Sequence, residues 1–265
     1  MHRSVAADLT LDVLEPAHVV LSIAVAQGDG LAVNDELIVE IDGKHAEVTE
    51  LTDHHGSRLH TIDATPGRMT VRYSAEADGR SEPPPFRDFD GILYLRPSRY
   101  CDSDTLYTTA QAEFVGLKGH DLLAAVSSWV GTRLEYIPGS SQPTDGAVQT
   151  LLSRRGVCRD YAHLSVALLR ACDIPARLVS AYAPGLDPMD FHAVCEAYVD
   201  GHWYAIDATA LAPRQSLLRI ATGRDASDVA FVTTQHGHVL LDAMEVRAVV
   251  DALPKDDITG LVELG

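Results

Sequence analysis

The sequence lacks any apolar run that approaches the ~20 residues needed for a membrane-spanning helix. Apolar stretches occur within residues 1–27, but Asp8, Asp12, Glu15 and His18 interrupt them. This segment also has no positively charged region followed by an unbroken apolar core, the pattern of a secretory signal peptide. We therefore expect a cytoplasmic protein without a membrane partner.

Basic residues are scarce as well. The chain has 21 Lys and Arg residues against 38 Asp and Glu residues, which gives a formal net charge of −17. No basic cluster is visible in the sequence, so binding to nucleic acid or to an anionic membrane is not expected. The simplest role for the acidic excess is to keep the protein soluble.

Closely spaced cysteines are absent. The sequence contains four cysteines and no CxxC pair: Cys101, Cys158, Cys172 and Cys195. Without an export signal, such cysteines are expected to be free thiols instead of a disulfide framework. We also find no nucleophile-elbow serine, phosphate-binding loop or dinucleotide fingerprint.

Three histidines near residue 57 are the first candidates for a metal site. His54, His55 and His60 lie close together in the sequence. No paired carboxylate or cysteine completes the four ligands that zinc prefers, so a surface loop is the better interpretation. We predict that the protein holds no metal ion and no cofactor.

The chain is long enough for two units, because it has 265 residues and is 46% hydrophobic. Residues 1–80 read as a β-rich domain. Its expected strands are rich in β-branched residues and cover 18–25, 36–41 and 68–73. Asp-Gly and Pro-Gly pairs at 29–30, 42–43 and 66–67 predict turns between strands. This pattern favours a small β-sandwich or open barrel.

Residues 81–95, which contain three consecutive prolines, are predicted to be a linker. Residues 96–265 then form the second predicted domain. An amphipathic helix is expected from the stripe Leu122, Leu123, Val126, Trp129 and Val130. A shorter helix is expected to start at the N-cap Thr144 and to end near Gly156, with Ala147, Val148, Leu151 and Leu152 facing inward. Strands return after Pro175, so the domain is predicted to be α+β.

Cys158 is expected in the first turn of a helix. It follows Gly156, where a tight turn would lead into the helix, and precedes an apolar stripe that ends at Pro175. The first turn has unpaired N–H groups and lies at the positive end of the helix dipole, and both favour a thiolate. Asp160 complements the dipole and is assigned a structural role. Taken alone, Cys158 could equally be a small buried hydrophobe.

A predicted hairpin brings a histidine and an aspartate together. Two strand-like runs, 191–199 and 202–209, flank Asp200-Gly201, a strong signal for a two-residue turn. In that register, paired residue numbers sum to 401. His192 and Asp207 then lie on one face as diagonal neighbours, roughly 7–8 Å apart at the backbone. A slip of one residue would separate the two side chains.

The same register suggests roles for neighbouring residues. Cys195 falls on the opposite face and is predicted to pack in the core, as is Cys172 on the helix stripe. Cys101 has no assignable partners. Glu196 shares the face of His192, where it would either flank the site or lie in solvent.

The span from Cys158 to Asp207 resembles the core of the transglutaminase-like, papain-related superfamily, whose members place Cys, His and Asp in this order. The matching segments are 156–162 (GVCRDYA), 174–177 (IPAR), 191–193 (FHA) and 203–209 (WYAIDAT). More narrowly, the chain is similar to bacterial cysteine peptidase members with a β-rich N-terminal domain. Two further segments are similar to motifs of that group, 94–100 (YLRPSRY) and 223–229 (GRDASDV).

This resemblance implies an α+β fold, with a papain/transglutaminase-like core and an N-terminal β-sandwich-like domain. It also implies a catalytic triad of Cys158, His192 and Asp207 that acts on a peptide or protein substrate through a thioester. Water would resolve the thioester in an amide or peptide hydrolase, and an amine would resolve it in a transglutaminase. A catalytically silent binding module and a metal site built from Cys158, His163 and His192 are the remaining alternatives. The oligomeric state is left open.

Some positions depart from the family pattern. Val194-Cys195 stands where relatives often have an aromatic residue after His-Ala, and Ala208 stands where they often have proline. Neither change removes a triad member. A side chain that would help the Cys158 N–H to bind the oxyanion is not identifiable from sequence, and Tyr136, Gln142 and Gln149 stay open as candidates.

Overall fold

A computed structural model describes residues 1–83, 85–258 and 260–265. Pro84, which belongs to the predicted linker, lies outside the described residues. The helices are α1 (Asp90–Leu93), α2 (Tyr107–Glu113), α3 (Gly119–Arg133), α4 (Ala147–Ser153), α5 (Cys158–Ala171), α6 (Ala226–Val229) and the 3-10 turn η1 (Arg214–Ser216). The first strands are β1 (His2–Glu15), β2 (Ala17–Leu21), β3 (Leu31–Ile41), β4 (Lys44–His45), β5 (Thr49–Thr52), β6 (Arg58–Ala64) and β7 (Gly67–Gly79). The later strands are β8 (Glu135–Tyr136), β9 (Arg155–Gly156), β10 (Ala176–Tyr182), β11 (Phe191–Val199), β12 (His202–Ile206), β13 (Leu218–Gly223), β14 (Val232–Gln235) and β15 (His238–Val250).

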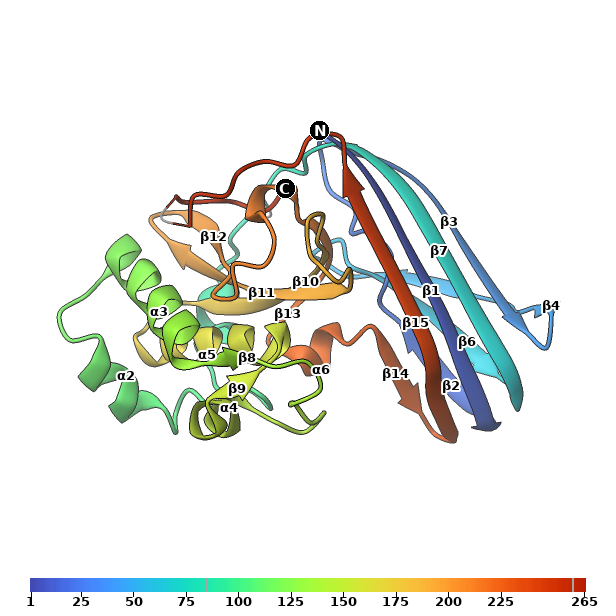
Figure 1. Cartoon of the computed structure of the whole chain (residues 1–265), viewed down its shortest axis with the longest axis horizontal. Coiled ribbons are helices and arrows are strands. Elements are labelled where there is room, and N and C mark those ends of the chain that lie inside the picture. Colours follow the sequence, from blue (N-terminus) through green and yellow to red (C-terminus); the bar gives the residue numbers. More distant parts are fainter. Residues whose placement is uncertain (84, 259) are drawn as a thin grey trace.

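The first unit is a sandwich of two antiparallel sheets, on the right in Figure 1. One sheet has the order β15-β1-β7-β3-β4 and the other the order β14-β2-β6-β5. Side chains alternate between buried and half-buried along β1 and β2, the period of a strand with one face in the core. The predicted β-rich N-terminal unit is therefore present.

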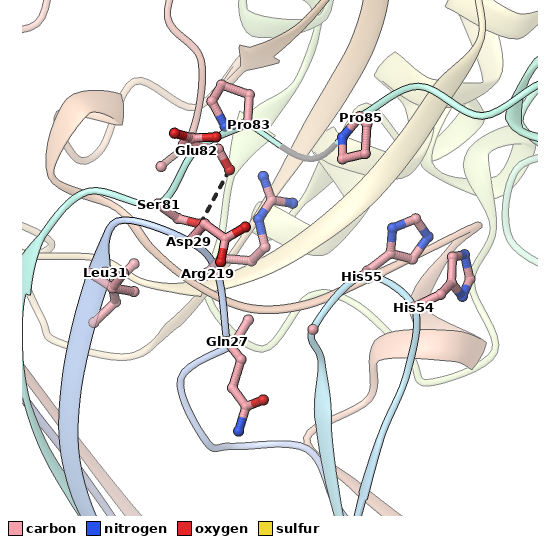
Figure 2. A pocket seen from close by; sticks show the side chains of 15 residues that line it. Gln27, Asp29, Leu31, His54, His55, Ser81, Glu82, Pro83, Pro85 and Arg219 are labelled. Carbon is pink, nitrogen blue, oxygen red and sulfur yellow. Dashed lines mark hydrogen bonds between the residues drawn. The ribbon is translucent and has the colours of Figure 1, made fainter.

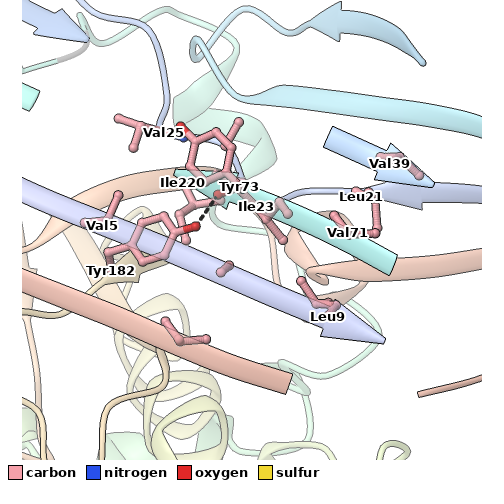
Figure 3. Close-up of a cluster of buried hydrophobic side chains, with 14 of the residues drawn as sticks. Val5, Leu9, Leu21, Ile23, Val25, Val39, Val71, Tyr73, Tyr182 and Ile220 are labelled. Atoms are coloured by element: carbon pink, nitrogen blue, oxygen red, sulfur yellow. Dashed lines mark hydrogen bonds between the residues drawn. The ribbon is translucent and has the colours of Figure 1, made fainter. Parts of the chain in front are cut away.

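The core of the sandwich continues into the second unit. Figure 3 shows Val5, Leu9 and Leu21 of the sandwich beside Tyr182 of β10 in one apolar cluster. The hydroxyl of Tyr182 donates a hydrogen bond to the carbonyl oxygen of Ile23 across 2.8 Å. Because both units contribute buried side chains, their contact has the apolar character of a protein interior.

The sandwich also contains two strands from near the C-terminal end of the chain, β14 and β15. β15 pairs with β1, and β14 pairs with β2. The chain therefore returns to the first unit after residue 231, which the prediction of 96–265 as one domain does not include. The alternation within 238–250 indicates a strand, but it does not specify which sheet the strand joins.

The second unit is a four-stranded antiparallel sheet of order β12-β11-β10-β13, covered by helices. Helix α5 packs against β10 and β11, and all of its residues from Asp160 to Ala171 are buried. It is thus a central helix, more fully buried than the predicted one-sided stripe. The chain is α+β, as expected from the sequence.

The two other predicted helices are present with different details. Helix α3 buries Leu122, Leu123, Val126 and Val130, as the stripe predicts. Helix α4 has Gly146 as its N-cap, so the prediction of Thr144 is wrong. Leu152 is 72% exposed, so the prediction that it faces inward is wrong. The helix ends at Ser153, and Arg154 follows in a left-handed conformation.

Two of the three clustered histidines have partners inside the protein. His55 Nε2 lies 2.7 Å from the Tyr94 hydroxyl, and His60 Nε2 lies 3.0 Å from Glu50. His54 and His55 lie in a turn, as predicted, whereas His60 is buried in β6, so a surface loop is the wrong description for His60. Within residues 1–83, 85–258 and 260–265, no helix is long and apolar enough to cross a membrane, and no group of three ligating side chains could hold a metal ion.

A buried ion cluster lies in the central sheet. Glu196 is 1% exposed, and its carboxylate accepts hydrogen bonds from Arg177 Nε (2.8 Å) and Arg219 Nη1 (3.0 Å). Burial by itself raises the pKa of Glu196, but Arg219 and Arg177 outweigh it and lower the pKa to about 2. The guanidinium of Arg177 also stacks on Trp203, 3.8 Å from the ring centroid. The alternative in which Glu196 lies in solvent is therefore wrong, because strand parity cannot reveal which layer covers a face.

We expect Glu196→Gln to lower the free energy of unfolding by about 3–5 kcal/mol, because it leaves two buried guanidinium groups without a counter-charge. Urea denaturation followed by circular dichroism measures the change. Glu245→Gln is the matched control, since its ion pair with Arg247 is exposed and is worth about 1 kcal/mol or less. A Glu196→Gln protein as stable as this control would contradict the prediction.

Candidate active site

Cys158 is the first residue of α5 and is half-buried. Gly156, two residues earlier, is needed for close approach and not for a left-handed turn. A Cβ atom at this position would lie 2.6 Å from the Cβ atom of Asp160, too close for two carbon atoms. The helix start predicted from the sequence is thus confirmed. Glycine is required at position 156 because Asp160 packs against it, and not because of a tight turn.

Asp160 caps the helix that carries Cys158. Its Oδ2 accepts a hydrogen bond from the N–H of Val157 (2.8 Å), and its Oδ1 accepts one from Ser141 Oγ (2.9 Å). Arg159 donates to the carbonyl oxygen of Gln142 (2.6 Å) and holds the same loop against the helix. Asp160 therefore has the structural role expected from sequence, and it leaves the N–H of Cys158 without a helix partner.

His192 and Asp207 are in direct contact. The hairpin pairs Val199 with His202 and Cys195 with Ile206, so the predicted register, in which numbers sum to 401, is confirmed. His192 Nε2 donates a hydrogen bond to Asp207 Oδ2 across 2.7 Å. A carboxylate accepts hydrogen bonds only, so this bond fixes the proton on Nε2.

Thr209 orients the aspartate, a contribution that sequence reasoning missed. Its N–H (2.9 Å) and its hydroxyl (2.6 Å) both donate to Asp207 Oδ1. The signal was present, because a Thr two residues after an Asp often closes this kind of turn. The second oxygen of the carboxylate thus remains aimed at His192.

Burial and charge compete at the His192–Asp207 pair. Burial lowers the pKa of His192, but Asp207 and Cys158 outweigh it and raise the pKa to about 10. Burial raises the pKa of Asp207, but the opposing effects of His192 and Thr209 are larger, so the pKa lies below its ordinary value. The pair therefore favours an imidazolium next to a carboxylate at neutral pH.

Cys158 also interacts with the imidazole of His192. Its side chain raises the pKa of His192 through a hydrogen-bond interaction and through its charge. The Nδ1 atom, which Asp207 does not use, is buried and has no well-aligned hydrogen-bond partner among the described side chains. The structure thus brings together all three residues of the predicted triad, with Nδ1 available to the thiol.

The other three thiols are different in character. Burial raises the pKa of Cys101 to about 12 and that of Cys195 well above its ordinary value. Both are fully buried, which confirms core packing for Cys195. Cys172 is the C-cap of α5 and is half-buried, and burial again raises its pKa.

His163 faces away from a shared metal site with Cys158 and His192. It is fully buried, its Nε2 accepts a hydrogen bond from the N–H of Ala226 (3.1 Å), and its ring stacks on Tyr100. Asp225 accepts a hydrogen bond from the N–H of Tyr100 (2.9 Å). The two outlying motifs, 94–100 and 223–229, therefore meet beside α5, where they hold the helix in place.

The candidates for an oxyanion donor differ in position. Gln149 is exposed on α4, and Gln142 lies in the loop whose backbone Arg159 binds. Tyr136 lies on β8, which pairs with the strand just before Cys158. Only Tyr136 has an interaction with Cys158 among these three.

A cavity of about 470 Å³ lies elsewhere, between the two units. Figure 2 shows Asp29, Glu82 and Arg219 on one side of it and His54 and His55 on the other. No triad residue lines this cavity. The cavity is therefore separate from the site formed by Cys158, His192 and Asp207.

The comparisons with known proteins agree with the geometry. The model of the transglutaminase-like superfamily matches residues 111–208, a span that contains Cys158, His192 and Asp207, the predicted triad. A solved structure of a candidate cysteine protease from Cytophaga hutchinsonii is 34% identical, with a TM-score of 0.86, and the match covers 97% of this chain and 92% of that one.

Two curated relatives are functionally uncharacterized mycobacterial proteins. One from Mycobacterium leprae is 29% identical over 54% of this chain and 53% of its own length. One from Mycobacterium tuberculosis strain H37Rv is 32% identical over 41% of this chain and 40% of its own length. The chain spans about half or less of the length of these relatives, so the match says nothing of their remaining parts.

Proposed function

Because this chain belongs to the transglutaminase-like superfamily through residues 111–208, we propose that it is a thiol-dependent amide or peptide hydrolase. Cys158 would be the nucleophile, His192 the general acid and base, and Asp207 the residue that orients and charges the histidine. The substrate would be a peptide or protein.

One observation supports the proposal above the others. His192 is hydrogen-bonded to Asp207 through Nε2, while Nδ1 has no other partner among the described side chains and the Cys158 side chain interacts with the ring. A histidine arranged in this way can exchange a proton with a thiol on one side while a carboxylate holds it on the other. A thiol that served only for packing would not require such a neighbour.

The reaction would proceed in two halves. The sulfur of Cys158 forms a bond to the amide carbonyl carbon, and the C=O electron pair moves to the oxygen. When the pair returns, the C–N bond breaks and the imidazolium of His192 protonates the leaving amine, which leaves a thioester. A water molecule deprotonated by His192 then attacks the thioester and releases the carboxylic acid and the free thiol.

An amine could replace the water in the second half and give transamidation. The triad is the same for both outcomes, because the acceptor depends on access to the thioester and not on how the thioester forms. Similarity to a candidate cysteine protease over nearly the whole chain favours hydrolysis. A binding module that does no chemistry is the competing hypothesis.

A peptide library separates these possibilities. We would incubate it with wild type and with Cys158→Ala, with and without an added primary amine, and read the products by mass spectrometry. Cleavage by wild type alone, without incorporation of the amine, supports the hydrolase. Incorporation of the amine supports the transferase, and no product in any sample supports the silent binding module.

A further inference from the structure

Tyr136 is held next to Gly156, two residues before Cys158. It lies in β8, which runs parallel to β9 with Tyr136 opposite Gly156. The N–H of Ile137 donates to the carbonyl oxygen of Gly156 (3.1 Å), and that of Glu135 donates to Arg154 (2.9 Å). These bonds fix the backbone of Tyr136 relative to the start of α5.

The side chain of Tyr136 extends toward the reactive groups. Burial and the charge of Cys158 raise the pKa of the Tyr136 hydroxyl to about 12, while a hydrogen bond with the backbone of Cys158 opposes this increase. Asp190 and Asp207, on the side of His192, raise it further. The hydroxyl is therefore within hydrogen-bond reach of the Cys158 backbone, and it keeps its proton at neutral pH.

The Tyr136 side chain is accessible to solvent, and a substrate must be able to reach it for the hydroxyl to act on the reaction. Tyr136 is 37% exposed, and its ring packs beside Tyr161 with 5.9 Å between centroids. The N–H of Cys158 lies in the first turn of α5 and has no acceptor within the helix. This N–H donates instead to the hydroxyl oxygen of Tyr136. The phenolic O–H and the backbone N–H therefore lie side by side, and an incoming oxyanion can accept hydrogen bonds from both in place of this contact.

We infer that the Tyr136 hydroxyl and the Cys158 N–H together bind the oxyanion that forms when Cys158 attacks a carbonyl group, an inference that rests on the proposed function. The sulfur–carbon bond forms, the C=O electron pair becomes the oxyanion, and both donors point hydrogens at it. When the pair returns and the leaving group departs, the hydroxyl has kept its proton. Tyr136 therefore acts by hydrogen bonding, not by proton transfer.

Gln142 and Gln149 do not compete for this role. The backbone of Gln142 is bound by Arg159 and Asp145, and its side chain is exposed. Gln149 is exposed on α4. Neither has a contact with Cys158 among the described residues.

The test uses p-nitrophenyl acetate, an activated ester that acylates thiols through an oxyanion and releases a coloured product. We expect Tyr136→Phe to slow the p-nitrophenol burst about 10²–10³-fold, the usual cost of one lost oxyanion donor. Tyr161→Phe is the matched control, because it removes a hydroxyl from the same aromatic pair, and its burst should stay within about twofold of wild type. Circular dichroism verifies that both variants are folded.

Alkylation by iodoacetamide provides the second measurement, because it consumes the thiol without forming an oxyanion. Its rate should be equal in Tyr136→Phe and wild type. A parallel decrease in alkylation and acylation, or an unchanged burst in Tyr136→Phe, overturns the role of Tyr136. No burst in wild type, or an equal one in Cys158→Ala, defeats the proposed function instead.

Discussion

Replacing Cys158 by alanine lowers the rate of substrate turnover by at least about 10⁴-fold, because no other group in the site can form the thioester. Binding of the substrate should persist, since the backbone N–H groups at the start of α5 remain. The measurement is kcat for any peptide that the library identifies. Protein stability should change little, because this side chain is only half-buried.

Cys172→Ala is the control for this prediction. This thiol lies at the other end of the same helix and is half-buried as well. Turnover should be unchanged in this variant. If Cys158→Ala retained more than a tenth of the wild-type activity, the nucleophile would have to be another residue.

Asp207→Asn should lower kcat by about 10⁴-fold, the size of effect seen when a triad carboxylate becomes an amide. The amide can donate a hydrogen bond to Nε2, which allows the proton of a neutral His192 to move to Nδ1 and away from its position in the wild type. The fold should survive, because asparagine has nearly the same shape. Steady-state kinetics on purified protein measures the effect.

The pH profile identifies the cause of this loss. In wild type, Asp207 and Cys158 raise the pKa of His192 to about 10, so we expect the imidazolium to persist, and activity to fall only as the pH rises through that value. Without the carboxylate, burial is unopposed on that side and lowers the pKa, so the alkaline decrease should move to lower pH by several units. Asp190→Asn, which changes an exposed carboxylate without a hydrogen bond to His192, should shift it far less. An unshifted profile in Asp207→Asn would refute the assigned role.

The residues of the candidate site could be predicted from the sequence more completely than the arrangement of the strands. A two-residue turn at Asp200-Gly201 sets strand register through local geometry, so the contact between His192 and Asp207 followed from numbering. The start of α5 was similarly local. Both features depend on residues that are near in sequence, where few alternatives exist.

Features that depend on distant partners were not predictable in this way. The pairing of β15 with β1 joins segments more than two hundred residues apart, and no local signal selects that partner. The ion cluster of Glu196 was missed because strand parity gives the face of a residue and not what covers it. The contact of Asp225 with Tyr100 likewise joins two motifs that sequence alone presents as separate.

The path of the chain between the two units has a consequence for unfolding. After β15, the segment 251–265 returns to the second unit, where Asp256 pairs with Arg214 (2.9 Å) and Val262 accepts a hydrogen bond from Ala205. Neither unit is therefore a continuous piece of polypeptide, and neither can be excised without removing strands or packing from the other. We expect the sandwich and the second unit to unfold on heating in one calorimetric transition. A substitution that unfolds the sandwich would therefore also separate Cys158 from His192 and Asp207.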